Sequence, residues 1–321
     1  MVDFFIDVHI ALRRTVIYLA SRDSSFLLFI ARVIVTFDQL WKVIANVYLS
    51  IYFRFIPSKK LNCDVHRVSP KLVVTLTTFP LRIDKLWLVL ECMLRQSIVP
   101  DEIHLWLSKD QFPNSIPKSI IRLIKKNVQV HYVDGDIRSH KKYYYVFKTN
   151  PNDNIVTIDD DILYRSDFLE TLLRYSSKYP KCVITNYARK MEYDETGLLS
   201  HNLWKQYDGE LTDKYVFFGS GGGTLFPPGS LHEEVLNIDS AWACCPTADD
   251  VWLNAMARLN GTRIIKTDYS VLLFPIVRWK DIALSANENE GDGNDLQIKK
   301  IRQYCIEKYS NDPFDVHKII K

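Results

Sequence analysis

The sequence lacks the cysteine patterns that bind zinc or cross-link small scaffolds. Its six cysteines are scattered, without a CxxC pair, at positions 63, 92, 182, 244, 245 and 305. Neither a zinc site nor a disulfide framework is indicated, because both need cysteines at short regular spacing or high density. We therefore expect a reduced, cytoplasmic setting for the chain.

Long apolar runs, an export signal and a strong charge excess are also absent. The longest uncharged run in the apolar N-terminal part, Val43 to Phe53, has eleven residues, whereas a bilayer-spanning helix needs about 20. The opening, MVDFFIDVHIALRR, places acids before the apolar residues and arginines after them, which reverses the layout of a secretory signal. A net charge of +3 is too small to indicate nucleic acid as a partner, so none is expected.

The first 60 residues form a segment of their own. They carry eight Lys or Arg against four Asp, so the positive excess of the chain belongs here. Polar residues recur every four positions, which predicts a helix with one narrow polar stripe at Asp38, Lys42, Asn46, Ser50 and Arg54. Such a helix lies in a membrane interface or packs against protein. The basic excess favours the interface, so we expect residues 1–60 to bind the inner face of the cell membrane peripherally.

From residue 68 onward the pattern is that of an α/β protein. Strand-like and helical runs alternate at 72–76, 83–96, 102–108, 115–126, 128–134 and 137–150. This alternation predicts a parallel, Rossmann-like sheet with helices on both faces.

Three consecutive aspartates follow the fourth strand in NDNIVTIDDDILYRSDF. The β-branched residues before them suit a buried strand, so Asp159, Asp160 and Asp161 should lie where that strand leaves the sheet. Open α/β sheets bind ligands at this edge. Adjacent carboxylates repel one another, so the triplet needs water, a cation or a donor, and a solvated acidic turn is the alternative interpretation.

A glycine-rich stretch, GSGGGTLF, follows a later strand-like run. Glycine at this density lets the backbone approach a ligand closely or adopt positive φ. Apolar residues at 216–218 and 225–226 would anchor the stretch in the core. They favour contact with a ligand over a mobile surface loop.

Four motifs occur in a recognisable order: TTFPLRI after the first strand, SHKK upstream of VTIDDDILY, GSGGGTLF, and ADDVWL on a helix. Together they resemble nucleotide-sugar-dependent glycosyltransferases of the GT-A fold, above all bacterial enzymes that build capsule, exopolysaccharide or lipopolysaccharide. The resemblance covers roughly residues 72–304. It implies a GT-A-type central sheet and a hexosyltransferase activity, with a nucleotide-binding half at 68–164 and an acceptor-binding half at 165–321.

The resemblance also implies a divalent cation, Mn²⁺ or Mg²⁺, on the diphosphate of the donor. Breaking a sugar–diphosphate bond creates negative charge that such a cation stabilises, and carboxylates plus phosphate oxygens typically hold it. Asp161 is the expected main metal ligand, with Asp159 directed to the ribose or to the metal. The other residues implied at the nucleotide sugar are Thr77, Thr78, Pro80, Arg82, Asp110, Lys142 and Asp160, and those of the acceptor-side loop are Gly221, Gly222 and Gly223. For Lys142 the alternative is a solvated lysine pair on a helix face.

An inverting transfer needs a base to take the proton of the acceptor hydroxyl. By resemblance this base is Asp250, the second acid of ADDVWL. The family often has Glu before this Asp, whereas this chain has Asp249, which leaves the division of roles between the two acids open. The alternative is a helix cap formed by Thr247 and Asp250, since acids are favoured in a first helical turn.

The expected partners are a UDP-sugar donor and a glycan or lipid-linked acceptor. Two rival interpretations remain. One is a haloacid-dehalogenase-type, Mg²⁺-dependent phosphatase, whose signature motif also starts with Asp-X-Asp after a strand. That family prefers Thr or Val where this chain has Ile162, and its motif follows the first strand of the domain. An inactive glycosyltransferase-like scaffold is the other, although the chain keeps both acidic clusters and the glycine stretch.

Overall fold

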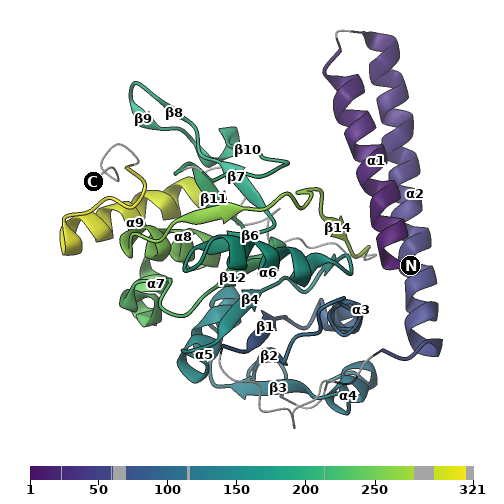
Figure 1. Ribbon diagram of the computed structural model, residues 1–321, viewed down its shortest axis with the longest axis horizontal. Helices are drawn as coiled ribbons and strands as arrows, with labels where there is room; N and C mark the ends of the chain where they lie inside the picture. The colour runs from purple at the N-terminus through teal and green to yellow at the C-terminus, as the bar shows by residue number, and fades with distance from the viewer. Residues whose placement is uncertain are drawn as a thin grey trace.

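The computed structural model describes residues 1–22, 24–58, 60, 70–113, 116–212, 214–277 and 293–315. Figure 1 shows an antiparallel pair of helices, α1 (Val2–Ala20) and α2 (Ser25–Phe55), standing beside an α/β body. We call this pair the hairpin. The expected start of the body at residue 68 lies outside the described residues, as do the last six residues of the chain.

The central sheet has seven strands: β1 (Leu72–Thr77), β2 (Glu102–Ser108), β3 (Val128–Val133), β4 (Asn154–Thr157), β6 (Val183–Thr185), β12 (Thr224–Phe226) and β13 (Ile264–Lys266). Their order is β13-β6-β12-β4-β1-β2-β3. The pairs β1–β2, β2–β3, β1–β4 and β6–β13 are parallel, whereas β12 runs antiparallel to both of its neighbours.

Helices cover both faces of this sheet, namely α3 (Ile83–Met93), α4 (Lys118–Ile124) and α6 (Phe168–Lys178) on one face, and α5 (Lys141–Thr149), α7 (Ile238–Cys244), α8 (Asp249–Leu259) and α9 (Gly293–Tyr309) on the other. Successive strand residues point to opposite faces, so Val74 packs on the α3 side and Val73 on the α5 side. The expected fold class, a mostly parallel GT-A-type α/β sheet with an N-terminal helical extension, is confirmed.

Shorter elements complete the body. They are η1 (Arg138–His140), β5 (Ile162–Leu163), β7 (Ala188–Lys190), β8 (Tyr193–Asp194), β9 (Gly197–Leu198), η2 (His201–Leu203), β10 (Lys205–Gln206), β11 (Val216–Phe218), η3 (Ser220–Gly222), η4 (Glu233–Leu236) and β14 (Phe274–Pro275). β7 pairs with β10 and β11, and β5 pairs with β14 directly after the aspartate triplet. Residues of η1, β7, η2, β11 and η3 form part of the walls of a cavity at the carboxyl ends of the parallel strands.

The hairpin packs on the body through both helices. Asp3 accepts a hydrogen bond from the backbone N–H of Ser166 at 2.7 Å, and Asp7 forms an ion pair with Arg165. Residues of both helices belong to the same continuous apolar core as α3 and the central sheet. The hairpin is therefore part of the folded unit rather than a loose appendage.

The polar stripe of α2 faces inward at its first three members, whereas Arg54 at its end is exposed. Asp38, Lys42 and Asn46 are buried, while apolar side chains on the opposite side of the helix are exposed. The sequence left open whether this segment packs on the core or lies in a membrane interface. Its polar side packs inward, and membrane contact stays a prediction. Within the described residues, no helix combines the length and the apolar character needed to cross a membrane.

Candidate active site

A cavity of about 740 Å³ opens at the carboxyl ends of β1 and β4. Its walls come from the loop after β1, the aspartate triplet, the start of α5, the glycine-rich η3 and the first turn of α8. Segments that lie far apart in the sequence thus meet at the edge where open α/β sheets bind ligands.

The aspartate triplet does not form a solvated turn. Asp160 is buried and accepts hydrogen bonds from the Thr78 hydroxyl at 2.5 Å and from Arg82 at 2.9 Å. The same guanidinium pairs with Asp161 at 2.7 Å. Arg82 keeps its charge, because these carboxylates outweigh its burial and raise its pKa. One side of the cavity is therefore built from carboxylates that are already fixed in position.

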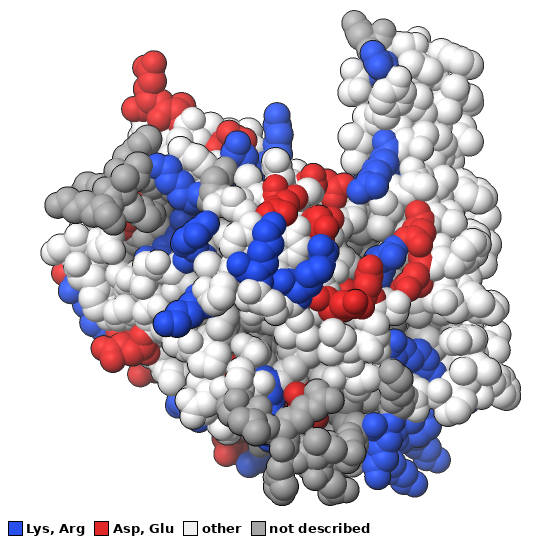
Figure 2. All heavy atoms as spheres, in the orientation of Figure 1, with Lys and Arg blue, Asp and Glu red and all other residues white. Residues whose placement is uncertain are grey.

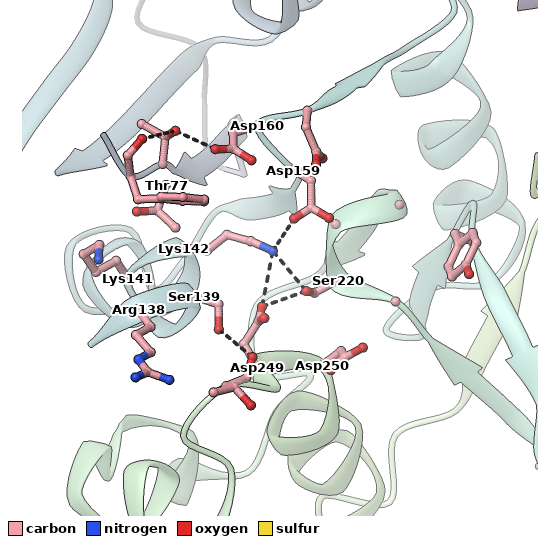
Figure 3. Close-up of a pocket in the computed structure, with 18 of the residues that line it drawn as sticks. Thr77, Arg138, Ser139, Lys141, Lys142, Asp159, Asp160, Ser220, Asp249 and Asp250 are labelled. Carbon is pink, nitrogen blue, oxygen red and sulfur yellow. Dashed lines mark hydrogen bonds and ion pairs between the residues drawn. The ribbon is translucent and has the colours of Figure 1, made fainter. Parts of the chain in front are cut away.

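Lys142 lies at the centre of the cavity wall (Figure 3). Its ammonium group is buried and donates to Asp159 at 2.7 Å and to the Ser220 hydroxyl at 3.2 Å, and it lies 3.4 Å from Asp249. Burial alone would lower the pKa of Lys142, but the charges of Asp159 and Asp249 hold it well above the ordinary value. The lysine is thus a permanent cation that links both acidic clusters, and it is not on a solvated helix face.

The glycine-rich η3 is closely packed against the aspartate triplet. A Cβ atom on Gly221 would lie 1.7 Å from Oδ2 of Asp159, and the carbonyl of Gly221 accepts from the Asp159 N–H at 3.1 Å. Gly221 and Gly222 line the cavity, whereas Gly223, with φ of 99°, packs beneath it against Phe168. Glycine is required here because the backbone must approach the carboxylate directly.

The two acids at the start of α8 have different surroundings. Asp249 accepts a hydrogen bond from the Ser220 hydroxyl at 2.7 Å and faces Lys142. Asp250 accepts from the Val251 N–H at 2.9 Å, and it has no ion pair within the described part of the chain. Burial, followed by the charge of Asp249, raises the pKa of Asp250 to about 7. Asp250 can therefore exchange a proton near neutral pH.

The start of α8 is not capped as the sequence predicts. The N-cap of α8 is Ala248, and no side chain caps it. The backbone N–H groups of Thr247 and Ala248 donate instead to the side chain of Gln297 in α9, each at 3.1 Å. The expected cap by Thr247 is therefore wrong: its hydroxyl accepts a hydrogen bond from Gln297 at 3.0 Å instead of one from the first turn of α8.

Not every residue implied by the resemblance reaches the cavity. Those that line it are Thr77, Thr78, Arg82, Lys142, Asp159, Asp160, Asp161, Gly221, Gly222, Asp249 and Asp250. Thr77 uses its hydroxyl to bond the carbonyl of Trp106 at 2.8 Å. Pro80 and Asp110 are exposed beside the cavity and do not line it.

Other lining residues were missed by the sequence analysis. Near the start of α5 they are Gln111, Asp136, Arg138, Ser139 and Lys141, and on the far wall they are Tyr187, Arg189, His201, Asn202, Phe217, Ser220, Thr247, Leu273 and Asn294. Ser139 and Lys141 stand in the SHKK motif and could have been found there. Arg189 and His201 carried no local signal. The pairing of β7 with β11 brings Arg189 to the cavity, and the packing of His201 in η2 against Trp204 and Phe217 brings the histidine there.

The aspartates of the cavity are the donors available to a divalent cation. Six of them line the cavity: Asp136 pairs with Lys141, and the other five lie around the cations Lys142 and Arg82, so this end of the cavity holds a surplus of carboxylate. The side chains of Asp159 and Asp161 are 39% and 27% exposed, respectively. No group of three or more His, Cys, Asp or Glu residues suited to a metal occurs in the described residues. The site fits Mg²⁺ or Mn²⁺ held by two carboxylates and completed by phosphate oxygens, not one held by protein alone.

Comparisons with known proteins do not assign this chain to a family. No family model matches the chain, and no curated protein matches it. Among solved structures it is similar to 4-diphosphocytidyl-2C-methyl-D-erythritol synthase, at 14% identity over 66% of this chain and 95% of that one, with a TM-score of 0.41.

Two glycosyltransferase-related structures match at a similar level. Residues 1–349 of S. aureus TarS share 16% identity over 62% of this chain and 58% of that one, with a TM-score of 0.42. The mannosyltransferase PcManGT from Pyrobaculum calidifontis, in complex with GDP-Man and Mn²⁺, shares 10% identity over 85% and 74%, with a TM-score of 0.45. Such values concern the fold alone, so the activity must be argued from the cavity.

Proposed function

We propose that this protein is a metal-dependent hexosyltransferase that moves a sugar from a nucleotide sugar, a UDP-sugar, to a glycan or lipid-linked acceptor in polysaccharide biosynthesis. The observation that carries the proposal is the position of Lys142. It contacts Asp159 of one acidic cluster and Asp249 of the other at 2.7 and 3.4 Å, so both clusters face one cavity. Sugar transfer needs both chemistries at one place: charge stabilisation for a diphosphate and a base for a hydroxyl.

The donor side of the proposal rests on the residues after β1 and β4. Asp161 and Asp159 would hold Mn²⁺ or Mg²⁺, and this ion supplies Lewis-acid stabilisation of the departing diphosphate. Arg82 and Thr78 keep Asp160 and Asp161 in position. Lys142 adds a fixed positive charge beside the diphosphate, which costs no reorganisation during the reaction.

The acceptor side of the proposal rests on Asp250. The acceptor oxygen forms a bond to the anomeric carbon, its proton passes to the carboxylate of Asp250, and the sugar–diphosphate bond breaks with its electron pair on the phosphate oxygen. A pKa of about 7 suits this role, because a base works best near the operating pH. Asp249, held by Ser220 and Lys142, is the positioning residue of the pair.

The proposal also includes an organisation and a location. Residues 68–164 form the nucleotide-binding half and residues 165–321 the acceptor-binding half. The protein works in the cytoplasm, on the inner face of the cell membrane. The helical hairpin supports this location, as argued in the next subsection.

Donor binding is the first test. Melting temperature is measured with a panel of nucleotide sugars, with and without Mn²⁺, since a ligand raises stability according to its concentration over its Kd. We expect a UDP-sugar to stabilise the protein only with metal, and Asp161→Asn to abolish the effect. The matched control is Asp110→Asn, an exposed aspartate outside the cavity, which should behave as the parent protein.

Two results would replace the proposal. Metal-dependent release of phosphate from small phosphomonoesters, without any stabilisation by a nucleotide sugar, would favour the phosphatase alternative. Stabilisation by no nucleotide sugar and no release of phosphate would favour an inactive scaffold. Equal metal-dependent stabilisation of the parent protein and Asp161→Asn would move the metal away from the aspartate triplet.

A further inference from the structure

The outward side of α2 carries an unbroken apolar stripe. Its members recur every three or four residues and are between 45% and 78% exposed: Phe26, Phe29, Val33, Phe37, Leu40, Ile44, Val47, Ile51 and Phe55. This spacing places them on one face of the helix, over a length of roughly 44 Å at 1.5 Å per residue. The first 56 residues hold 17 of the 27 exposed large hydrophobic side chains in the described part of the chain. We call this surface the outer stripe.

Buried polar contacts fix the outer stripe in its outward position. His9 of α1 lies 2.6 Å from Asp38 through Nδ1, and Lys42 pairs with the same carboxylate at 3.3 Å. His9 also donates through Nε2 to the carbonyl of Leu273 in the body at 3.1 Å. Rotating α2 to bury the stripe would break these contacts and expose partners that are paired now. The exposed apolar face is thus a feature that the fold maintains.

Among the described residues of α2, the exposed charges beside the outer stripe are basic. Asp3 and Asp7 of α1 are bound to Ser166 and Arg165 of the body, and Asp38, the only acid of α2, is buried. Arg32 and Arg54 are exposed next to members of the stripe, and Arg22 is exposed at the tip. In Figure 2 the visible face of the hairpin is mostly uncharged away from the body, and acidic residues appear where it meets the body.

We infer that the outer stripe is a docking surface for a lipid bilayer with anionic headgroups, with α2 lying in the plane of the interface. An apolar face with aromatic residues and flanking arginines fits acyl chains and anionic headgroups together. A second copy of this chain is the less favoured occupant. Its outer stripe would place further arginines opposite the first set, and α2 has no exposed acid to pair with them. The inference deepens the location proposed above and does not depend on sugar transfer.

This docking surface is connected to the cavity. Leu273, whose carbonyl is bound by His9, lines the cavity, and Arg165 and Ser166 follow the aspartate triplet closely along the chain. A bilayer bound to the outer stripe would therefore hold the cavity beside the membrane surface. This arrangement suits an acceptor that is itself anchored in the membrane.

The inference differs from the sequence expectation in what drives binding. If the apolar stripe enters the interface, association should persist at high salt, because burial of apolar surface is not screened. If the basic excess alone attracted the protein, high salt would remove it. The full-length chain is floated with vesicles of phosphatidylcholine and phosphatidylglycerol at low and high salt, without nucleotide sugar or metal.

Three variants make the test specific. The combined change Phe29→Ser, Phe37→Ser and Ile44→Ser should lower vesicle binding on the order of 100-fold, since each residue withdraws apolar surface from the interface. The matched control is Ile121→Ser, Ile124→Ser and Leu296→Ser on exposed body helices, which should bind as the parent chain does. Arg22→Gln, Arg32→Gln and Arg54→Gln together should weaken binding only when anionic lipid is present.

Two results would overturn the inference. One is a failure of the flotation test, either because the parent chain stays in solution or because the stripe variant floats as the parent does. The other is a parent chain that forms dimers by light scattering without binding vesicles, together with a monomeric stripe variant. That second result would make a second copy the occupant. Sugar transfer to a soluble acceptor, measured on the same variants, tests the proposed function separately.

Discussion

At the scale of single residues, Lys142 determines how the cavity works. Its ammonium group is buried, and a buried charge is tolerated only when it is paired and hydrogen-bonded. The partners Asp159, Ser220 and Asp249 come from three distant segments, which the lysine holds at fixed distances. The same side chain therefore contributes to the stability of the site and to its charge.

Replacing Lys142 with Met should remove both contributions. Two carboxylates lose their buried partner, so we expect the free energy of unfolding to fall by about 3–5 kcal/mol. Urea denaturation measures the change, and donor binding should be lost in parallel. Lys148→Met, at an exposed position on the same helix, should change neither quantity. Equal denaturation midpoints for both variants would show that Lys142 is not a buried ion-pair centre.

The raised pKa of Asp250 predicts how activity depends on pH. The base must be ionised, so kcat/KM should rise with pH through about 7 and level off above it. Asp250→Asn should lower turnover by roughly 10²- to 10⁴-fold and remove this rise. A profile without an inflection near neutral pH in the parent protein would exclude Asp250 as the base.

The same pKa predicts an effect on stability with the opposite sign. The folded chain binds the Asp250 proton more tightly than the unfolded chain, whose pKa stays near the ordinary 3.8. The contribution of Asp250 is therefore full at low pH and is lost as pH rises from about 4 to about 7. We expect Asp250→Asn to melt higher than the parent protein at pH 8, by a margin that shrinks at pH 5. Asp249→Asn, which loses the Lys142 contact, should melt lower at both pH values.

At the scale of elements, the glycine-rich η3 positions the aspartate triplet by direct contact. Gly221→Ala would place a methyl group 1.7 Å from Asp159 Oδ2, so the carboxylate or the loop must move. We expect a loss of stability of about 1–3 kcal/mol and weaker metal-dependent donor binding. The control is Gly261→Asn, since this glycine has φ of 72° and no neighbour within 4 Å of an added Cβ. Unchanged donor binding in Gly221→Ala would show that the loop only fills space.

Elements whose signal is local could be predicted from the sequence. The first strand was expected at 72–76 and is Leu72–Thr77, because periodicity and β-branched residues report a buried strand directly. The aspartate triplet was expected where β4 leaves the sheet and lies there. The far wall of the cavity could not be predicted. Arg189 reaches it through the pairing of short strands and His201 through the packing of η2 on Phe217, and no local pattern encodes such long-range contacts.

At the scale of the whole molecule, the sequence predicted which residues form the polar stripe of α2, but not whether that stripe faces the protein or the solvent. Periodicity tells which residues share a face, and only a partner tells which face is inside. Here the partner of Asp38 is His9 of α1, 29 positions away, and Leu273 on the body completes the contact. The apolar face therefore points outward, the reverse of an ordinary surface helix.

Asp38→Asn tests whether hairpin and body unfold together. Asp38 is completely buried between His9 and Lys42, so the variant leaves the lysine charge buried without its partner. We expect the free energy of unfolding to fall by about 3–5 kcal/mol. Asp7→Asn breaks an ion pair whose carboxylate is 55% exposed, and it should cost less than about 1 kcal/mol.

The number of unfolding transitions of Asp38→Asn shows whether the hairpin and the body form one cooperative unit. Residues of α1 and α2, among them Phe5 and Phe53, belong to the same apolar core as Trp87 of α3 and the central sheet. Because that core is continuous, helical circular dichroism and tryptophan fluorescence should shift together in one transition, for the variant as for the parent. A variant whose helical signal melts early, while the body and donor binding keep their parental midpoint, would make the hairpin an independent unit. In that case the hairpin could bind a membrane without holding the cavity beside it.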